Sequence, residues 1–419
     1  MRIETLLNKV CRLKSFVYKD VKIKSIGRRD AIVVDIVPRK NGLPICSSCM
    51  NAGPVYDHMP EERQFQFVPI WNMPVYFYYR MRRVDCKECG VKVEQVPWAE
   101  GKSHITKPFA LFLARWARKL SWKETAESFC TTWDTVFRSI KQIVEYGMKR
   151  RNIEGITAIG VDEIQHGKGH QYLTLVYQID PEKKRLLFVG KDRKAKTLLR
   201  FFRDLGKERC ARIQYVCSDM WQAYIKVIVK KVPQALHILD RFHIVQNLNK
   251  AIDKIRAEEI RRLAAEGYDA NVLKNTKYCF LKNEDNLTDK QKAKLGDVLQ
   301  YDLKSVRAYL LKESFQLFWN YKDPRWAEWY LNKWCARAMR SKLDPIKKFV
   351  QMLRRHQPLI MNWFKAKKAY NSGIVEGLNR KINLVTRKSF GFRSYDVLKI
   401  ALFHNMGELP EPDFTHRFC

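Results

Sequence analysis

The chain has 419 residues, of which 79 are Lys or Arg and 44 are Asp or Glu, so its formal net charge is +35. Hydrophobic residues make up 46% of it, which excludes global disorder, and the length predicts about two to four domains. No apolar run approaches the roughly 20 residues that a membrane-spanning helix needs. The expected partner of the excess positive charge is therefore nucleic acid and not a membrane.

The first hundred residues predict a small zinc-binding β domain. Short strands are expected at 30–37, 65–70 and 75–84, around two cysteine pairs. The pairs are Cys46-x2-Cys49 and Cys86-x2-Cys89, and four thiolates on two such turns are a ligand set for structural Zn²⁺. The alternatives are accidentally spaced free cysteines, or His58 in place of one thiolate. Eleven cysteines is an odd number, which indicates reduced thiols in the cytoplasm and not a disulfide framework.

Residues 101–152 predict a helix-turn-helix. Ser121 and Glu124 form a capping box, and a second helix start follows at Thr131 to Asp134. The alternative is an ordinary helical hairpin that packs on the core. In the DNA-binding interpretation, four side chains of the second helix face a major groove: Trp133, Thr135, Arg138 and Lys141.

From residue 153 the pattern changes to alternating strands and helices. Strands are expected at 156–162, 172–180, 185–191, 213–219 and 235–240, with helices at 194–205 and 221–232. This order predicts a ribonuclease-H-like α/β core, of which residues 153–245 are the first part. Residues 246–370 predict an all-helical insertion, and residues 371–419 return to the core with a helix at about 372–388. The fold class is thus multidomain α/β.

Three acidic residues stand out in this cationic chain. Asp162 and Asp219 each end a short apolar run of strand type, and Glu376 lies among cations on the late helix. Carboxylates that converge in a basic groove hold divalent metals against a phosphodiester. Each acid also has a structural interpretation: a strand-end turn for Asp162, a helix N-cap for Asp219, and a first-turn acid beside the helix dipole for Glu376.

Further polar and aromatic residues accompany these acids. An Asp240/His243 pair follows the last predicted core strand, where the alternative is a satisfied strand-to-helix corner. The late helix offers four expected contacts to the DNA backbone: Asn379, Arg380, Lys381 and Arg387. Five tryptophans of the insertion are candidates for stacking on bases or for core packing: Trp319, Trp326, Trp329, Trp334 and Trp363.

With these motifs the sequence resembles bacterial DDE-type insertion-sequence transposases of the ISL3 type. Those proteins pair an N-terminal four-cysteine zinc finger with a helix-turn-helix and a ribonuclease-H-like catalytic domain. The matching segments are CSSC, RRVDCKEC, SWKETAESFCTTWDTVFRSI, GVDE, CSDMWQAY, LDRFHIVQNLN and SGIVEGLNRKINLVTRKSFGFRS.

The resemblance implies that Asp162, Asp219 and Glu376 are the catalytic acids. They would hold two Mg²⁺ (or Mn²⁺) per active site, roughly 4 Å apart. Asp240 and His243 match an Asp/Cys-x2-His element of several such transposases, and His243 would orient an acid or the scissile phosphate.

The expected reaction is cleavage at the element's terminal inverted repeats and joining of the 3′-ends to target DNA. A homodimer on double-stranded DNA, associated with the bacterial nucleoid in the cytoplasm, is the expected assembly. Two other functions remain open at this point: a non-catalytic DNA-binding regulator, and a ribonuclease-H-like DNA nuclease that cuts strands without joining them.

Overall fold

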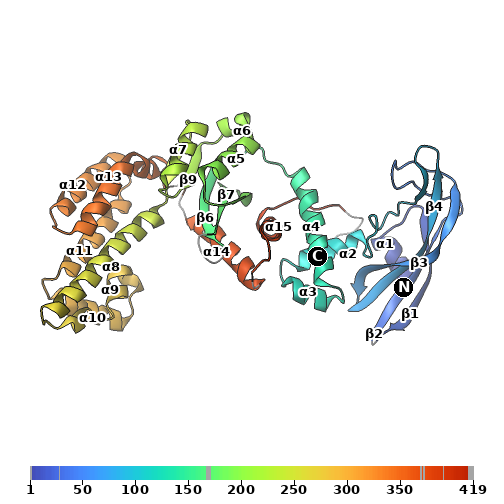
Figure 1. Ribbon diagram of the computed structural model, residues 1–419, viewed down its shortest axis with the longest axis horizontal. Helices are drawn as coiled ribbons and strands as arrows, with labels where there is room; N and C mark the ends of the chain where they lie inside the picture. Colours follow the sequence, from blue (N-terminus) through green and yellow to red (C-terminus); the bar gives the residue numbers. More distant parts are fainter. Residues whose placement is uncertain are drawn as a thin grey trace. The chain divides into compact units, whose positions relative to one another are not determined.

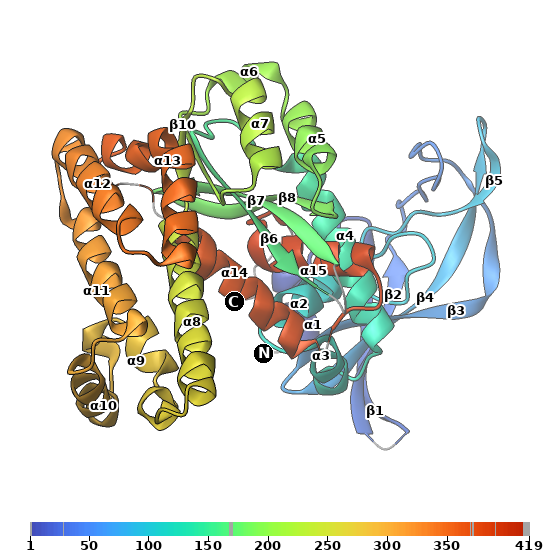
Figure 2. The same cartoon turned by 60° about the vertical axis from the view of Figure 1, so that its left-hand side comes forward.

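The computed structural model of the protein describes residues 2–27, 29–166, 171–368, 370, 373–389 and 391–413. Its contacts divide the chain into two compact units (Figures 1 and 2). Unit 1 comprises the described residues of 1–152 and 382–419, and unit 2 comprises those of 153–381. None of the described helices is long and apolar enough to span a membrane.

Unit 1 begins with helix α1 (Ile3–Val10) and a five-stranded sheet. The strands are β1 (Phe16–Ile26), β2 (Arg29–Pro38), β3 (Val55–Ile70), β4 (Met73–Cys86) and β5 (Gly90–Val93). Their order is β1-β2-β4-β3, and β5 pairs with β4. The strands predicted at 30–37, 65–70 and 75–84 lie within β2, β3 and β4. Phe65, Phe77 and Trp98 are fully buried in the core of this sheet.

Four further helices and the end of a helix shared with unit 2 complete the described part of unit 1. They are α2 (Lys107–Trp116), α3 (Trp122–Ser128), α4 (Trp133–Arg150) and α15 (Tyr395–Met406), joined by the last residues of the shared helix α14 (Gly373–Lys388). The predicted capping box of Ser121 and Glu124 forms, and the N-cap of α4 is Thr132. Helix α15 packs against α4, and a Cβ on Gly147 of α4 would lie 2.6 Å from the Leu409 Cβ.

Unit 2 is built on a second five-stranded sheet. Its strands are β6 (Ala158–Gln165), β7 (Tyr172–Asp180), β8 (Lys183–Lys191), β9 (Tyr215–Ser218) and β10 (Leu236–Leu239), in the order β10-β9-β6-β7-β8. Strands β6, β7 and β8 are antiparallel, whereas β6, β9 and β10 run parallel to one another.

One face of this sheet is covered by α5 (Ala195–Leu205) and α7 (Gln222–Lys231), with the short α6 (Lys207–Ala211) between them (Figure 1). Ile159, Val161 and Val216 of the sheet pack there with apolar residues of α5 and α7. The opposite face receives the start of α14, because Gly160 of β6 lies against Val375.

The predicted end of the strand that carries Asp162 is wrong. The strand expected to end at Asp162 continues to Gln165, because its antiparallel pairing with β7 extends beyond Gly160, where its parallel pairing with β9 ends. Asp162 therefore still pairs with β7, but it lies beyond the last residue of β6 that pairs with β9.

The predicted helical insertion follows β10 directly (Figure 2). Its elements are α8 (Arg241–Ala265), η1 (Ala270–Leu273), α9 (Lys277–Leu281), η2 (Glu284–Asn286), α10 (Asp289–Leu299), α11 (Lys304–Gln316), η3 (Leu317–Asn320), α12 (Pro324–Met339) and α13 (Asp344–Lys365). Helix α13 packs on both α8 and β10, which attaches the insertion to the edge of the sheet.

Candidate active site and metal-binding residues

The four predicted cysteines come together in unit 1. The sulfur atoms of Cys46, Cys49, Cys86 and Cys89 all lie within 4.8 Å of one another. Sulfurs bonded to one tetrahedral Zn²⁺ at about 2.3 Å would be roughly 3.8 Å apart, so this set fits the ion. Backbone N–H groups of Cys49 and Ser48 lower the pKa of Cys46 to about 7, which favours its thiolate form. These residues form a structural zinc site.

In unit 2, the strand register brings three aspartates to the same end of three parallel strands. Gly160 of β6 pairs with Cys217 of β9, so Asp162 and Asp219 are each two residues beyond a paired position. Leu239 of β10 pairs with Ser218, and the Asp240 N–H donates to the Ser218 carbonyl. Because in-register residues of parallel strands meet at the same level, Asp162, Asp219 and Asp240 share one end of β6, β9 and β10.

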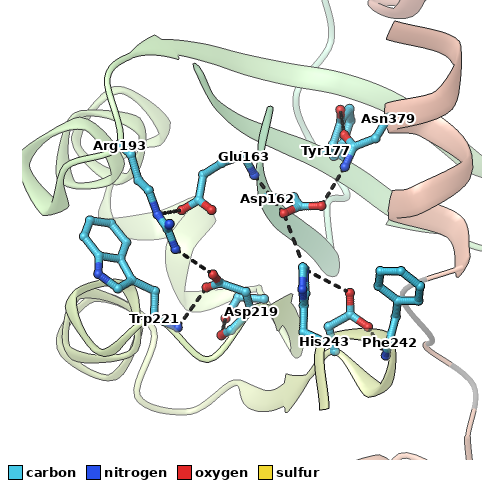
Figure 3. Close-up of polar contacts among 11 residues, drawn as sticks. Asp162, Glu163, Tyr177, Arg193, Asp219, Trp221, Phe242, His243 and Asn379 are labelled. Atoms are coloured by element: carbon cyan, nitrogen blue, oxygen red, sulfur yellow. Dashed lines mark hydrogen bonds and ion pairs between the residues drawn. The ribbon is translucent and has the colours of Figure 1, made fainter. Parts of the chain in front are cut away.

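Asp162 is held by groups from three elements (Figure 3). Its Oδ2 accepts a 2.6 Å hydrogen bond from the Asn379 amide of α14, and the Tyr177 hydroxyl of β7 donates to the Asn379 Oδ1. The His243 Nε2 of α8 lies 4.0 Å from Asp162 Oδ1 and 3.6 Å from Asp240 Oδ2. Burial raises the pKa of Asp162, and the Asp240 charge adds to this effect, whereas the hydrogen bond from Asn379 opposes it.

Asp219 belongs to a second group of contacts at the same end of these strands. Its Oδ1 accepts from the Trp221 N–H at the start of α7, and its Oδ2 lies 3.0 Å from Arg193 Nη2. The same guanidinium is 3.0 Å from Glu163 Oε1 and stacks over the Trp221 ring. Burial, and next the charge of Asp219, raise the pKa of Glu163 to about 8, and Arg193 opposes the shift. Arg193 thus bridges two acids from neighbouring strands (Figure 3).

Glu376 lies in the first turn of α14, where its side chain is 37% exposed and pairs with Arg380 at 2.7 Å. Among the residues that the structure describes, the four cysteines are the one group of three or more His, Cys, Asp or Glu side chains placed to hold a metal ion. Asp162, Asp219 and Glu376 do not form such a group. Glu376 and Asp162 nevertheless lie in the same part of unit 2, because Glu376 is one helical turn before Asn379, whose side chain contacts Asp162.

The predicted DNA-contacting residues of α4 lie at its N-terminal half. Trp133 and Arg138 are exposed, and the Arg393 guanidinium lies 5.8 Å from the Trp133 ring centroid. Arg138 pairs with Asp134 and Lys141 with Glu145, both in exposed pairs that cost little to break. Thr135 shares a hydrogen bond with the N-cap Thr132. On α14, Arg380, Lys381 and Arg387 are exposed, whereas Asn379 contacts Asp162.

Sequence reasoning missed Glu163 and Arg193. Glu163 directly follows Asp162, where the predicted strand was expected to end, and its sequence context does not indicate burial. Its burial, with 8% of the side chain exposed, follows from its pairing with Arg193. Arg193 is one cation in the run KDRKAK, and its sequence context does not distinguish it from its neighbours.

Two family models match this chain. Residues 159–402, more than half of the chain, match the family model of the ISL3-type DDE transposase domain, described as a transposase. Residues 43–89 match the model for the zinc-finger of transposases IS204, IS1001, IS1096 and IS1165.

Two curated relatives extend this match over most of the chain. The transposase for insertion sequence element IS1001 of Bordetella parapertussis is 28% identical over 82% of this chain and 84% of its own length. The transposase for IS1557 of Mycobacterium tuberculosis is 29% identical over 93% of this chain and 92% of its own. The chain therefore belongs to the ISL3 family of DDE transposases, enzymes of DNA transposition.

Proposed function

We propose that unit 2 is a ribonuclease-H-like catalytic core in which Asp162, Asp219 and Glu376 hold two divalent cations, Mg²⁺ or Mn²⁺. The observation that carries this proposal is the register of β6 and β9, which brings Asp162 and Asp219 level with each other on adjacent parallel strands. The sheet order β10-β9-β6-β7-β8, with three antiparallel strands followed by two parallel ones, supports the fold assignment.

The chemistry of the donor set fits hard divalent cations. Mg²⁺ and Mn²⁺ prefer carboxylate oxygen, and all three proposed ligands are carboxylates. The raised pKa values of Asp162 and Glu163 reflect burial and mutual repulsion of acids, which a divalent cation would relieve. Glu376 would join from α14, since the Asn379 contact holds that helix beside Asp162.

Bound cations would activate the attacking oxygen and stabilise the leaving oxygen of the phosphodiester. The chain's own residues would position the reacting groups around them. Asn379, oriented by Tyr177, fixes one oxygen of Asp162. His243, beside Asp162 and Asp240, orients the acid or the scissile phosphate. Arg193 fixes Asp219 through its shared pairing with Glu163.

We further propose that the zinc finger and the helix-turn-helix of unit 1 bind the element's terminal inverted repeats. Trp133, Thr135, Arg138 and Lys141 would read the major groove, and the exposed cations of α14 would contact phosphates. Water would first break the phosphodiester at the element end and leave a 3′-hydroxyl. That hydroxyl would then attack a phosphodiester of target DNA and release a strand end of the target. A homodimer on the nucleoid would hold two ends together.

The test is incubation of the full chain with its element's end DNA and Mg²⁺, with mapping of the cut positions. We expect cuts at the inverted repeats and strand transfer from pre-cut ends. Asp162→Ala, Asp219→Ala and Glu376→Ala should abolish cleavage while end binding persists. Asp204→Ala is a matched control, because Asp204 is an exposed acid of α5 in the same unit and pairs with Arg203.

The outcomes separate the alternatives. Specific end binding without any Mg²⁺-dependent cleavage would indicate a regulator, and cleavage without strand transfer would indicate a nuclease. Wild-type cleavage by any one of the three alanine variants would remove that acid from the proposed site.

A further inference from the structure

The tryptophans of the helical insertion divide into two groups. Trp319, Trp334 and Trp363 are buried, at 3%, 3% and 6% exposure, and they pack against phenylalanines of the insertion core. Trp326 and Trp329 of α12 are instead 59% and 45% exposed. Their rings meet edge to face with centroids 5.9 Å apart. Adjacent exposed aromatic side chains on a helix indicate a binding surface.

Cations continue this aromatic pair along α12. A shallow groove of about 440 Å³ is lined by Trp329, Tyr330, Lys333, Trp334, Ala336, Arg337 and Arg340. The Lys333 Nζ lies 3.9 Å from the Trp329 ring centroid. Because these positions recur every three or four residues, they form one stripe along the helix, roughly 20 Å long from Trp326 to Arg340 at 1.5 Å per residue. We call Trp326, Trp329, Lys333, Arg337 and Arg340 the α12 stripe.

The stripe carries positive charge that the surrounding protein does not neutralise. Across the described ranges, no carboxylate forms an ion pair with Lys333, Arg337 or Arg340. Arg337 bonds the Ser314 hydroxyl, and Arg340 donates to the Ala336 carbonyl. Glu328 is the acid of α12, and its carboxylate accepts from Gln357 of α13. An anionic ligand is therefore the complementary partner.

We propose that the α12 stripe is a second nucleic-acid site, which binds single-stranded DNA. Two exposed indoles offer faces on which unpaired bases stack, and the cations beside them would bind the phosphates of the same strand. Duplex DNA keeps its bases stacked inside and would use only the cations. The helix packs on α13, η3 and α11, on the far side of the insertion from β6 (Figure 1). The bound strand is thus separate from the bond that is cut.

A second copy of the chain fits the stripe less well. In a two-fold symmetric contact the same surface is present on both sides, so Lys333, Arg337 and Arg340 of both copies would enter one interface. The stripe contributes no carboxylate to pair with them, and like charges brought together at an interface disfavour association.

The experiment uses the full chain without added Mg²⁺ or Mn²⁺, so that its result does not depend on cleavage and the structural zinc stays bound. The probe is an oligothymidylate of about 12 nucleotides, within the usual site sizes of single-strand binding proteins. Because other cationic surfaces of the chain also bind DNA, the local readout is photo-crosslinking with iododeoxyuridine in the probe, followed by peptide mapping. We expect a crosslink in the peptide that contains Trp326 and Trp329. Crosslinks elsewhere but none in this peptide would overturn the proposal.

Variants then test both parts of the stripe by fluorescence anisotropy. Trp326→Ala/Trp329→Ala should weaken binding at least tenfold for the single strand and by less than twofold for a duplex of equal length. Lys333→Ala/Arg337→Ala/Arg340→Ala should lower the slope of log affinity against log salt by about 2, at roughly 0.7 per lost phosphate contact. Unchanged single-strand affinity in both variants would overturn the proposal.

Matched controls come from the same insertion. Tyr268→Ala removes an exposed aromatic side chain, and Lys290→Ala/Lys292→Ala removes exposed cations of α10. Both should bind the single strand as the wild type does. A fall in molecular mass by sedimentation in the tryptophan variant, with single-strand binding intact, would instead assign the stripe to a second copy of the chain.

Discussion

Replacing Gly160 by alanine tests whether α14 must lie against β6 for the acids to act together. A Cβ on Gly160 would lie 2.5 Å from the Val375 Cγ2 and 3.3 Å from the Ile179 Cγ2. Carbon atoms pack at about 3.5–4.0 Å, so α14 would have to move by roughly 1 Å. That shift carries Asn379 and Glu376 away from Asp162. Displacements of this size cost roughly 100-fold in rate, and overpacking costs about 1–3 kcal/mol in stability.

The assay is Mg²⁺-dependent cleavage of end DNA by Gly160→Ala, with folding checked by circular dichroism and urea unfolding. Val375→Ala in the same chain removes the methyl group that the new Cβ meets, and should restore most of the lost rate. Val375→Ala alone leaves Gly160 in place and measures the cost of the cavity by itself. A folded Gly160→Ala protein that cleaves at the wild-type rate would refute the packing argument.

Three further variants test other parts of the account. Glu94→Gln breaks a buried ion pair whose two side chains are 4% and 1% exposed. The free energy of local opening that hydrogen exchange measures in β4 should therefore fall by about 3–5 kcal/mol. Glu127→Gln breaks an exposed ion pair and should change that free energy by less than about 1 kcal/mol. Equal losses would contradict this. Cys86→Ser removes one of four thiolates, and bound zinc should fall well below one ion per chain; full zinc content would refute the site. Asn379→Ala removes the hydrogen bond that the Asn379 amide donates to the Asp162 carboxylate, worth about 1.5 kcal/mol, so the already raised pKa of Asp162 should rise further and the cleavage profile should move to higher pH. An unmoved profile would count against that role.

Periodicity predicted most elements of the fold because they rest on local patterns. The strand expected at 172–180 matches β7, and the helices at 194–205 and 221–232 contain α5 and α7. The C-terminal segment from Ile382 was expected to stay with the core, whereas its contacts are with unit 1. That grouping depends on tertiary contacts such as those of Gly147 with Leu409, which leave no periodic signal.

The sequence predicted the site residues that follow the ends of strands. It did not predict the residues whose role depends on a partner from another strand or helix. Asp162 and Asp219 stood out because each acid follows an apolar run. The role of Asn379 as a donor to Asp162, and of Arg193 as a bridge between Glu163 and Asp219, needs the packing of elements that are distant in sequence. No spacing rule encodes such contacts, since they depend on the geometry of the whole unit.

Convergence of three carboxylates on one metal site is the central claim, and iron-directed cleavage measures it most directly. Fe²⁺ substituted for Mg²⁺ reduces added hydrogen peroxide to a hydroxide ion and a hydroxyl radical, and is itself oxidised to Fe³⁺. The radical cuts the protein backbone next to the bound ion, and the fragments identify the nearby residues. We predict cuts close to Asp162, Asp219 and Glu376 together, all suppressed by excess Mg²⁺. Cuts near Asp162 and Asp219 without any near Glu376 would contradict the account.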